Sequence, residues 1–318
     1  MTTERSWQHL NKPLPETFPA RHYSRNTLNR LLAAKEIARI RPGIYAYTTP
    51  ETVKPHSTFE QRRIHQLLLI SAAQWQLKPH EVVSHGSAAA LWGLLVPEPE
   101  EEVHITVAEG AQIRRQGERR HLLYLPESHV TTRHAIRVTT LERTIVDCMR
   151  TAKPMEALAI ADHALARGVS REQCLSINAA LRSPKRRKRT TCLLNRATSL
   201  AESIPESYMR YVAWLAGMTD LVPQYQVRLE GRTFRLDIGA PQLKIALEYD
   251  GRIKYADSPD ALYHEKLRED ILRRAGWLVV RVVAKDLHNI HGLVARMRAA
   301  MRARGIVEYA DIDPVLRE

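Results

Sequence analysis

Cysteine is scarce in this chain of 318 residues, which contains only three. Cys148, Cys174 and Cys192 lie far apart and form no C-x-x-C pair, so they fit neither a disulfide framework nor a cysteine zinc site. The fourteen histidines likewise show no H-E-x-x-H or zinc-finger spacing. This pattern indicates a reducing compartment, and we expect a cytoplasmic protein.

Long apolar runs are also missing. No stretch of the sequence approaches the roughly 20 apolar residues that a membrane helix needs. Residues 1–16, MTTERSWQHLNKPLPE, are polar and contain no apolar signal core. We therefore expect no membrane-spanning segment and no membrane partner.

Acidic residues are fewer than basic ones in this chain. The chain has 48 Lys and Arg against 35 Asp and Glu, which gives a net charge of +13 and a pI of about 9.8. Such an excess favours a polyanionic partner, either nucleic acid or an acidic membrane surface. The alternative is a protein that is merely basic.

The length predicts two or three domains, and the hydrophobic content of 44% is enough for globular cores. We expect a multidomain protein of mixed α/β and α+β class. Composition and periodicity divide the chain into four regions: residues 1–57, 58–182, 183–201 and 202–318.

Residues 1–57 contain a helix followed by a basic hairpin. Ser24 is a good N-cap for a helix with leucines on one face, and IARIRPGIYAY alternates apolar and polar residues around a Pro-Gly turn. This order is typical of the end of a winged helix-turn-helix, in which the helix enters the major groove of DNA. A helix and hairpin that only pack together fit equally well. The candidate DNA contacts here are Arg25, Asn29, Arg30, Arg39 and Arg41.

Residues 58–182 are predicted to form a mixed α+β domain, with helices at TFEQRRIHQLLLISAAQWQL, SHGSAAALWGLL and TTLERTIVDCMR and a strand at VHITVA. Residues 183–201 are a predicted basic linker, because SPKRRKRTT holds five consecutive basic residues. Such a block also suits phosphate contacts that add affinity without reading sequence. The candidate DNA contacts here are Lys185, Arg186, Arg187, Lys188 and Arg189.

Acidic residues stand out in the last region. A helix over SIPESYMRYVAWLAG holds Glu206, and two strands follow, TFRLDI with Asp237 and LKIALEYD with Glu248 and Asp250. Residues two apart on a strand share a face, which places the last two carboxylates about 6 to 7 Å apart. Glu206 also fits a capping box with Ser203, a structural role that is compatible with a functional one.

Acids that converge on one face of a sheet repel one another unless a cation lies among them. Mg²⁺ (or Mn²⁺) binds carboxylate, phosphate and water oxygens, and it can activate a bound water and hold a phosphodiester oxygen. Metal-dependent phosphodiester hydrolysis is one chemistry that joins these acids to a basic chain, with Asp237 and Glu248 among the candidate metal ligands. The alternative is an amphipathic hairpin whose acids lie in water or pair with Arg235 and Lys244.

The predicted hairpin raises a question of register. A tight turn over residues 239–242 would pair Asp237 with Lys244 and leave Glu248 too far along the strand. A bulge or a shifted register, which Gly239 and Pro241 can support, is required to bring the two acids together.

The order ESYMRYVAWLAG, QVRLEGRTFRLD, KIALEYDG and EKLREDILRRAGWLVVRV, over roughly residues 200–300, resembles the PD-(D/E)XK nuclease superfamily. The branch is the one similar to very-short-patch-repair (Vsr) endonucleases. The resemblance implies a restriction-endonuclease-like α/β domain with a mixed central sheet. It also implies that Asp237 is the metal-binding Asp, Glu248 the acid of E-x-K, and Glu206 the helical Glu near the metal.

Two positions depart from the family pattern. Asp250 stands where the motif has Lys, and Lys254 stands where the branch usually has His. Lys254 either replaces the lysine that stabilises charge on the attacked phosphate or marks a site that has lost activity, and Lys266 is a second candidate for that charge. By the same resemblance, Arg268, Asp270 and Arg281 have structural or phosphate-contacting roles.

The pieces IARIRPGIYAY, VVSHGSAAALWGLL, HITV and VTTLERTIVDCMR resemble the AbiEi antitoxin family of type IV toxin–antitoxin systems. Two functions follow from the two resemblances. One is a metal-dependent DNA endonuclease with its own winged-helix-like DNA-binding unit. The other is a non-catalytic transcriptional regulator or antitoxin, with a toxin protein as an expected partner and a homodimer as an expected state. Because phosphate contacts do not distinguish RNA from DNA, an RNA-binding or RNA-cutting protein is a third, weaker alternative.

Overall fold

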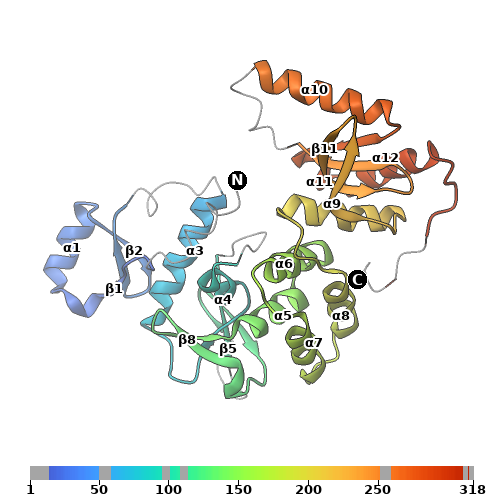
Figure 1. Ribbon diagram of the computed structural model, residues 1–318. Helices are drawn as coiled ribbons and strands as arrows, with labels where there is room; N and C mark the ends of the chain where they lie inside the picture. The colour runs from blue at the N-terminus through green and yellow to red at the C-terminus, as the bar shows by residue number, and fades with distance from the viewer. Residues whose placement is uncertain are drawn as a thin grey trace. The chain divides into compact units, whose positions relative to one another are not determined.

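The computed structural model describes residues 14–49, 59–94, 101–107, 114–250 and 259–310, together with residue 314. These residues combine α-helices with three separate β-sheets (Figure 1), which confirms the expected mixed, multidomain class. They form two compact units, one of residues 1–151 and 169–187 and the other of residues 152–168 and 188–318. None of the described helices combines the length and apolar character needed to cross a membrane.

The first unit begins with a small antiparallel sheet and one helix, shown in blue in Figure 1. The helix begins after Ser24, whose Oγ accepts a hydrogen bond from Thr27 N at 3.1 Å, so the predicted N-cap is confirmed. The chain then turns at Gly43, which has a φ of 76° that favours glycine. The elements are β1 (Phe18–Pro19), η2 (Ala20–His22), α1 (Arg25–Ala33), β2 (Ile37–Arg41) and β3 (Ile44–Tyr47), in the sheet order β1-β3-β2.

The rest of the first unit is built on a six-stranded mixed sheet. Its elements are α3 (Phe59–Gln74), β4 (Val82–Val83), α4 (His85–Trp92), β5 (Val103–Val107), β6 (Arg114–Arg115), β7 (Glu118–Leu122), η3 (Glu127–His129), β8 (Val130–Arg133), β9 (Ile136–Thr139), α5 (Leu141–Thr151) and α7 (Arg171–Ala180), in the sheet order β6-β7-β5-β4-β9-β8. Val103, Ile105 and Val107 of β5 join a core that includes residues of α3 and α4. Because side chains alternate along a strand, His104 and Thr106 lie on the other face, where they are also buried.

The second unit contains a four-stranded mixed sheet. Its elements are α6 (Pro154–Ala166), α8 (Arg187–Arg196), α9 (Ile204–Ala216), β10 (Val222–Leu229), β11 (Arg232–Ala240), β12 (Ile245–Tyr249), α10 (Pro259–Arg274), β13 (Leu278–Val282), α11 (Ala284–His288) and α12 (Ile290–Arg302). The order is β10-β11-β12-β13, antiparallel except for the parallel pair β12 and β13. A parallel pair requires a crossover, and the connection here contains α10. The expectation of a mixed central sheet in this region is confirmed.

Helices cover both faces of this sheet, which runs through the yellow-to-red part of Figure 1. On one face, Met209 of α9 and Met297 of α12 share a core with Leu247 of β12. On the other, Leu272 of α10 packs with Ala246 of the same strand. Side chains at alternate positions of β12 therefore meet different helices.

The division of the chain differs from the one expected at residue 182. Helix α6 packs against α9 in the second unit, where Asp162 accepts hydrogen bonds from Ser207 Oγ at 2.6 Å and from Arg210 Nη2 at 2.7 Å. The segment predicted as a flexible linker contains α8, with Leu193 and Leu194 buried. The segment predicted as a linker thus contains a helix anchored by buried leucines, and the chain passes from one unit to the other inside this segment, between Arg187 and Lys188.

Candidate functional site

The hairpin of β11 and β12 sets the positions of the predicted acids. The ladder runs from Ala240 opposite Ile245 to Ile238 opposite Leu247, so continuing the register places Asp237 opposite Glu248. The turn occupies residues 241–244, two residues farther along than a turn over 239–242. The shifted register that the sequence required is therefore present, and it brings the two acids to the same end of the hairpin.

Asp237 completes the pairing at this end of the sheet. Its Oδ2 accepts a hydrogen bond from Tyr249 N at 2.8 Å, so a side-chain carboxylate takes the place of a backbone carbonyl. The Asp237 side chain is half-buried. One of its two oxygens is thus engaged within the hairpin itself.

The carboxylate of Glu248 is paired with an arginine side chain of the same unit. Its side chain is 11% exposed, and both of its oxygens accept hydrogen bonds from Arg268 of α10, with Nη1 to Oε2 at 2.9 Å and Nη2 to Oε1. Arg268 also donates to the Arg235 carbonyl at 3.0 Å, which fixes the guanidinium in place. A two-pronged arginine–carboxylate pair of this kind is both strong and geometrically specific. Arg268 therefore supplies the positive charge that a metal ion would supply.

Glu206 caps the helix that carries it. Its Oε1 accepts from Ser203 Oγ at 2.8 Å, and its Oε2 accepts from Glu202 N at 2.9 Å and from Gln224 Nε2 at 2.8 Å. Ser203 is the N-cap, since its Oγ accepts a hydrogen bond from Glu206 N at 3.3 Å. The Glu206 carboxylate bonds the backbone N of Glu202, one residue before the cap, so only the Ser203 half of the predicted capping box is present. Burial raises the pKa of Glu206, and the nearby negative charge of Asp237 raises it further. The two acids are thus close enough to interact electrostatically.

Asp250 has one buried oxygen, Oδ1, without a hydrogen-bond partner among the described residues. Its backbone N donates to the Val282 carbonyl at 2.8 Å, which holds the end of β12 against β13. Lys254 lies outside the described residues, and Lys266 on α10 is exposed. Two further residues named by the resemblance form surface pairs, Asp270 with Arg273 at 2.8 Å and Arg281 with Glu269 at 3.2 Å.

We call Glu206, Asp237, Glu248 and Asp250 the carboxylate edge. Glu206 belongs to α9, which packs on one face of the sheet, whereas Glu248 pairs with α10 on the other face. In the part of the chain that the structure describes, no three acids place their oxygens within 4.8 Å of one another. Asp237 and Glu248 are thus brought together by register, while Glu206 approaches Asp237 from a different layer.

The candidate DNA contacts of the first unit divide into two groups. Arg25, Asn29, Arg30 and Arg39 are exposed, and α1 contains no acid. Arg41 is buried and donates to Glu118 of β7 at 2.7 Å. The prediction that Arg41 contacts DNA was wrong, because its partner lies in a strand distant in the sequence.

Most of the basic run in residues 185–189 is engaged inside the protein. Arg186 donates to the carbonyls of Arg150 and Thr151, both at 3.0 Å, and Arg187 donates to the Leu181 carbonyl. Arg189 is buried and donates to the Ala152 carbonyl at 2.9 Å. The exposed side chains that could contact phosphate are those of Lys185 and Lys188. Three of the five basic side chains thus have a structural role, and their predicted contacts with DNA are left to the two lysines.

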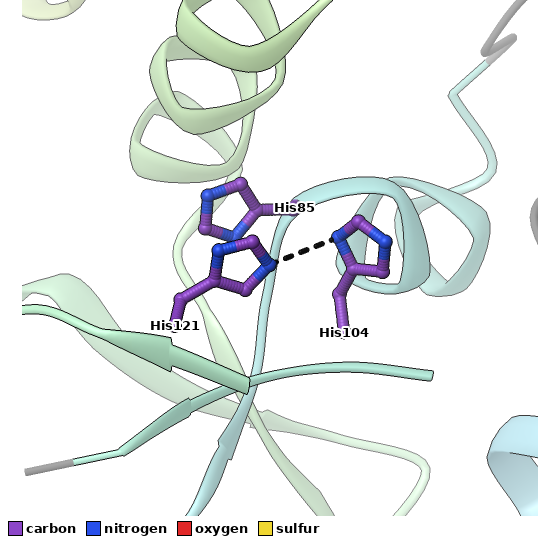
Figure 2. A group of neighbouring side chains, drawn as sticks. All are labelled: His85, His104 and His121. Atoms are coloured by element: carbon purple, nitrogen blue, oxygen red, sulfur yellow. Dashed lines mark hydrogen bonds between the residues drawn. The ribbon is translucent and has the colours of Figure 1, made fainter. Parts of the chain in front are cut away.

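Three histidines that sequence reasoning passed over meet in the first unit (Figure 2). His85 begins α4, His104 lies in β5 and His121 lies in β7, and one ligand nitrogen of each lies within 4.8 Å of the others. His121 Nε2 and His104 Nδ1 share a hydrogen bond of 3.2 Å, and the rings of His85 and His121 stack at 3.7 Å. We call these residues the histidine cluster. The signal available in the sequence was His104, a polar residue inside the apolar strand VHITV.

Burial lowers the pKa of His85 well below its usual range, and the neighbouring His121 and His104 lower it further. A cavity of about 810 Å³ opens beside the cluster, lined by His85 and His121. Its other charged or titratable lining residues are His129, Arg143, Asp147, Arg150, Arg182 and Lys185. We call it the basic cavity. The structure thus contains a second candidate site that is separate from the carboxylate edge.

Comparison with known proteins adds little to this geometry. No protein-family model matches the chain, and a search of curated proteins finds no match. Among solved structures, the chain is similar to the Rv2827c protein from Mycobacterium tuberculosis, with a TM-score of 0.39 and 13% identity, over 61% of this chain and 76% of that one. The function is therefore argued from the sites themselves.

Proposed function

We propose that this chain is a DNA-binding regulator of the type IV antitoxin kind, whose nuclease-like region binds DNA or a partner protein without cutting DNA. The observation that carries the proposal is the pairing of Arg268 with both oxygens of Glu248. A metal ion at this edge would have to displace a guanidinium held by three hydrogen-bond contacts. The presence of Asp250 at the position of the motif lysine supports the same conclusion.

The surface of the first unit supports DNA as the partner. Arg25, Asn29 and Arg30 are exposed on a helix that carries no acid, and Arg39 is exposed on the hairpin that follows. Arginine and asparagine side chains suit both phosphate contacts and base edges in the major groove. The net charge of +13 adds a long-range attraction to a polyanion.

Binding and cleavage are best tested on the same full-length protein. We expect no nicking of supercoiled plasmid in Mg²⁺ or Mn²⁺, together with duplex DNA binding that weakens as salt rises. Each phosphate contact contributes about 0.9 to the slope of log affinity against log salt. The double variant Arg25→Ala/Arg30→Ala should therefore flatten the slope by about 2, whereas Lys78→Ala, which removes an exposed lysine of the first unit outside the candidate DNA contacts, should leave it unchanged.

The second candidate function is a metal-dependent DNA endonuclease. It is favoured by the buried Oδ1 of Asp250, which has no hydrogen-bond partner within the described ranges, and by the register that places Asp237 opposite Glu248. Metal-dependent nicking that disappears in both Asp237→Ala and Glu248→Ala would establish this enzyme and overturn the regulator. Loss of all DNA binding under low salt would contradict both functions.

A further inference from the structure

The histidine cluster has the composition of a transition-metal site. Imidazole nitrogen is a preferred ligand of zinc, copper and nickel, whereas magnesium and calcium prefer oxygen. Three protein ligands with a fourth position left open is the arrangement of catalytic zinc sites. The cluster therefore differs in chemical class from the carboxylate edge, which consists of oxygen ligands.

One distance matches what a metal requires, and the His85 ring, which is stacked on His121, must tilt for its lone pair to reach the same point. In a tetrahedral zinc site with Zn–N bonds of about 2.0 to 2.1 Å, ligand nitrogens lie about 3.3 Å apart. His121 Nε2 and His104 Nδ1 are already 3.2 Å apart, and all three residues offer nitrogens within 4.8 Å. When a metal binds, the proton between these two rings can move to the other nitrogen of its own ring, so that each neutral imidazole presents a lone pair.

The backbone and the surroundings hold His85 in place. His85 has a φ of 49°, in the left-handed region that residues other than glycine rarely adopt. Its Nδ1 lies 2.9 Å from Ser84 Oγ, which leaves Nε2 as the nitrogen for coordination. Metal-binding histidines are usually oriented by such a contact on the other ring nitrogen. The two remaining histidines come from strands β5 and β7, which pair directly in parallel.

The charges around the cluster indicate what the fourth ligand would be. Three neutral imidazoles leave the double positive charge of a metal uncompensated, and Arg143 and Arg150 line the same cavity. Metal alone would therefore be opposed by like charges. An anion that contacts both the metal and the arginines would remove this repulsion.

Arg143 shows where such an anion would bind. Its side chain is fully buried, and its Nε donates to both oxygens of Asp147 at 2.9 Å. Its Nη2 is buried and donates to no described group, although the residue lines the cavity. A buried donor without an acceptor is costly, and an oxyanion would satisfy it.

We propose that His85, His104 and His121 bind one divalent transition-metal ion, such as zinc, and that an oxyanion in the basic cavity completes its coordination. The cavity volume of about 810 Å³ is within the range of small-molecule sites, so the expected natural ligand is a small molecule that carries a phosphate group. Metal and anion should each strengthen the binding of the other, because coupling between two sites is reciprocal.

The test uses tag-free, full-length protein stripped with EDTA and titrated with zinc by calorimetry. We expect one zinc per chain. Affinity should fall at least about 100-fold in His104→Ala and in His121→Ala, since even outer-shell changes weaken metal binding roughly 10- to 100-fold. His80→Ala, which removes an exposed histidine of the same unit, is the matched control and should bind as the wild type does.

The anion is tested with sulfate, a tetrahedral oxyanion that does not precipitate zinc, against chloride at equal ionic strength. We expect sulfate to tighten zinc binding roughly 5- to 150-fold, the usual span of coupling between sites. The gain should shrink in Arg182→Ala/Lys185→Ala and persist in Lys35→Ala/Lys78→Ala, which removes the same charge outside the cavity.

Two results would overturn the metal site. One is zinc binding that His104→Ala and His121→Ala leave unchanged. The other, which needs no variant and so does not depend on variant folding, is a cobalt-substituted wild type with only the weak visible absorption of octahedral cobalt. An equal zinc affinity in sulfate and chloride would overturn the anion.

Discussion

The carboxylate edge and the histidine cluster are both groups of buried or half-buried titratable side chains, yet charge is neutralised in different ways around them. At the carboxylate edge, Glu248 is matched by Arg268 from within the same unit. In the basic cavity, the Nη2 of Arg143 has no acceptor among the described residues, although Asp147 faces the same side chain. A carboxylate whose two oxygens are both taken by one arginine has a structural role, whereas a buried polar atom without a partner indicates a ligand. By this measure Glu248 is already satisfied, and the open positions of the two sites, among the described residues, are the Nη2 of Arg143 in the basic cavity and the Oδ1 of Asp250 at the carboxylate edge.

The largest expected effect is a loss of stability in the second unit, and it tests whether metal binding in the first unit depends on the second. Asp162 and Arg210 form a buried ion pair at 2.7 Å that joins α6 to α9 in the second unit. Asp162→Ala leaves the Arg210 charge buried and should lower the free energy of unfolding of that unit by about 3 to 5 kcal/mol. We expect the zinc affinity of the first unit to be unchanged. A parallel loss of zinc binding would mean that the sites are coupled.

The next effect concerns Asp147 in the wall of the basic cavity. Burial raises the pKa of Asp147 to about 6 from an ordinary value of 3.8. Between these values the folded protein keeps a proton that the unfolded chain has lost, so the contribution of Asp147 to stability is fully present below pH 4 and is lost as pH rises through 6. The free energy of unfolding should fall by about 3 kcal/mol across this window.

Unfolding of the first unit measured from pH 4 to pH 7 would check this dependence. Asp147→Asn should remove this part of the slope, because asparagine does not titrate. Glu172→Gln, which changes an exposed acid, serves as the control. A slope that is the same in wild type and Asp147→Asn would contradict the assignment.

The third effect separates an ion pair from an unoccupied metal site. If Arg268 compensates Glu248, then Glu248→Ala should destabilise the second unit by about 2 kcal/mol. This value lies between the cost of losing an exposed ion pair and that of breaking a fully buried one. If the acids instead repel one another around an absent metal, the same change should stabilise that unit. Glu269→Ala, which removes an exposed pair with Arg281, should cost at most about 1 kcal/mol. Urea denaturation of the three proteins distinguishes the outcomes.

The smallest effect concerns Glu206, which shares its capping role with Ser203. Glu206→Gln keeps the shape of the side chain and removes a charge whose pKa is raised by burial and by Asp237. We expect a change of less than about 1 kcal/mol at pH 7, as for other partial losses of a helix cap. If Glu206 instead binds a catalytic metal, the same variant should abolish metal-dependent nicking without altering stability.

Prediction from the sequence succeeded where the structure depends on near neighbours. The cap at Ser24, the N-cap at Ser203 and the alternation of LKIALEYD all appear in the structure. The expected mixed sheet of the last region is also present. Each of these features depends on hydrogen bonds or periodicity over a few residues, which the order of amino acids contains directly.

Prediction failed where a partner comes from a distant segment. Arg41 was expected to face DNA but pairs with Glu118, and Arg189 was expected in a linker but is buried in a helix. The histidine cluster was missed because its members come from α4, β5 and β7 and share no spacing motif. Sequence motifs record spacing within one segment, and they do not show that side chains from three separate segments lie close together in the fold.

The sequence by itself determined the class of fold, the basic character of the chain, and the alternation that places Glu248 and Asp250 on one side of their strand. The tertiary structure alone decided which charges meet: Arg268 with Glu248, Arg41 with Glu118, and three histidines with one another. The physical reason is that electrostatic and metal-binding interactions depend on distance in space. Strand register and helix packing set that distance between residues that the chain holds far apart.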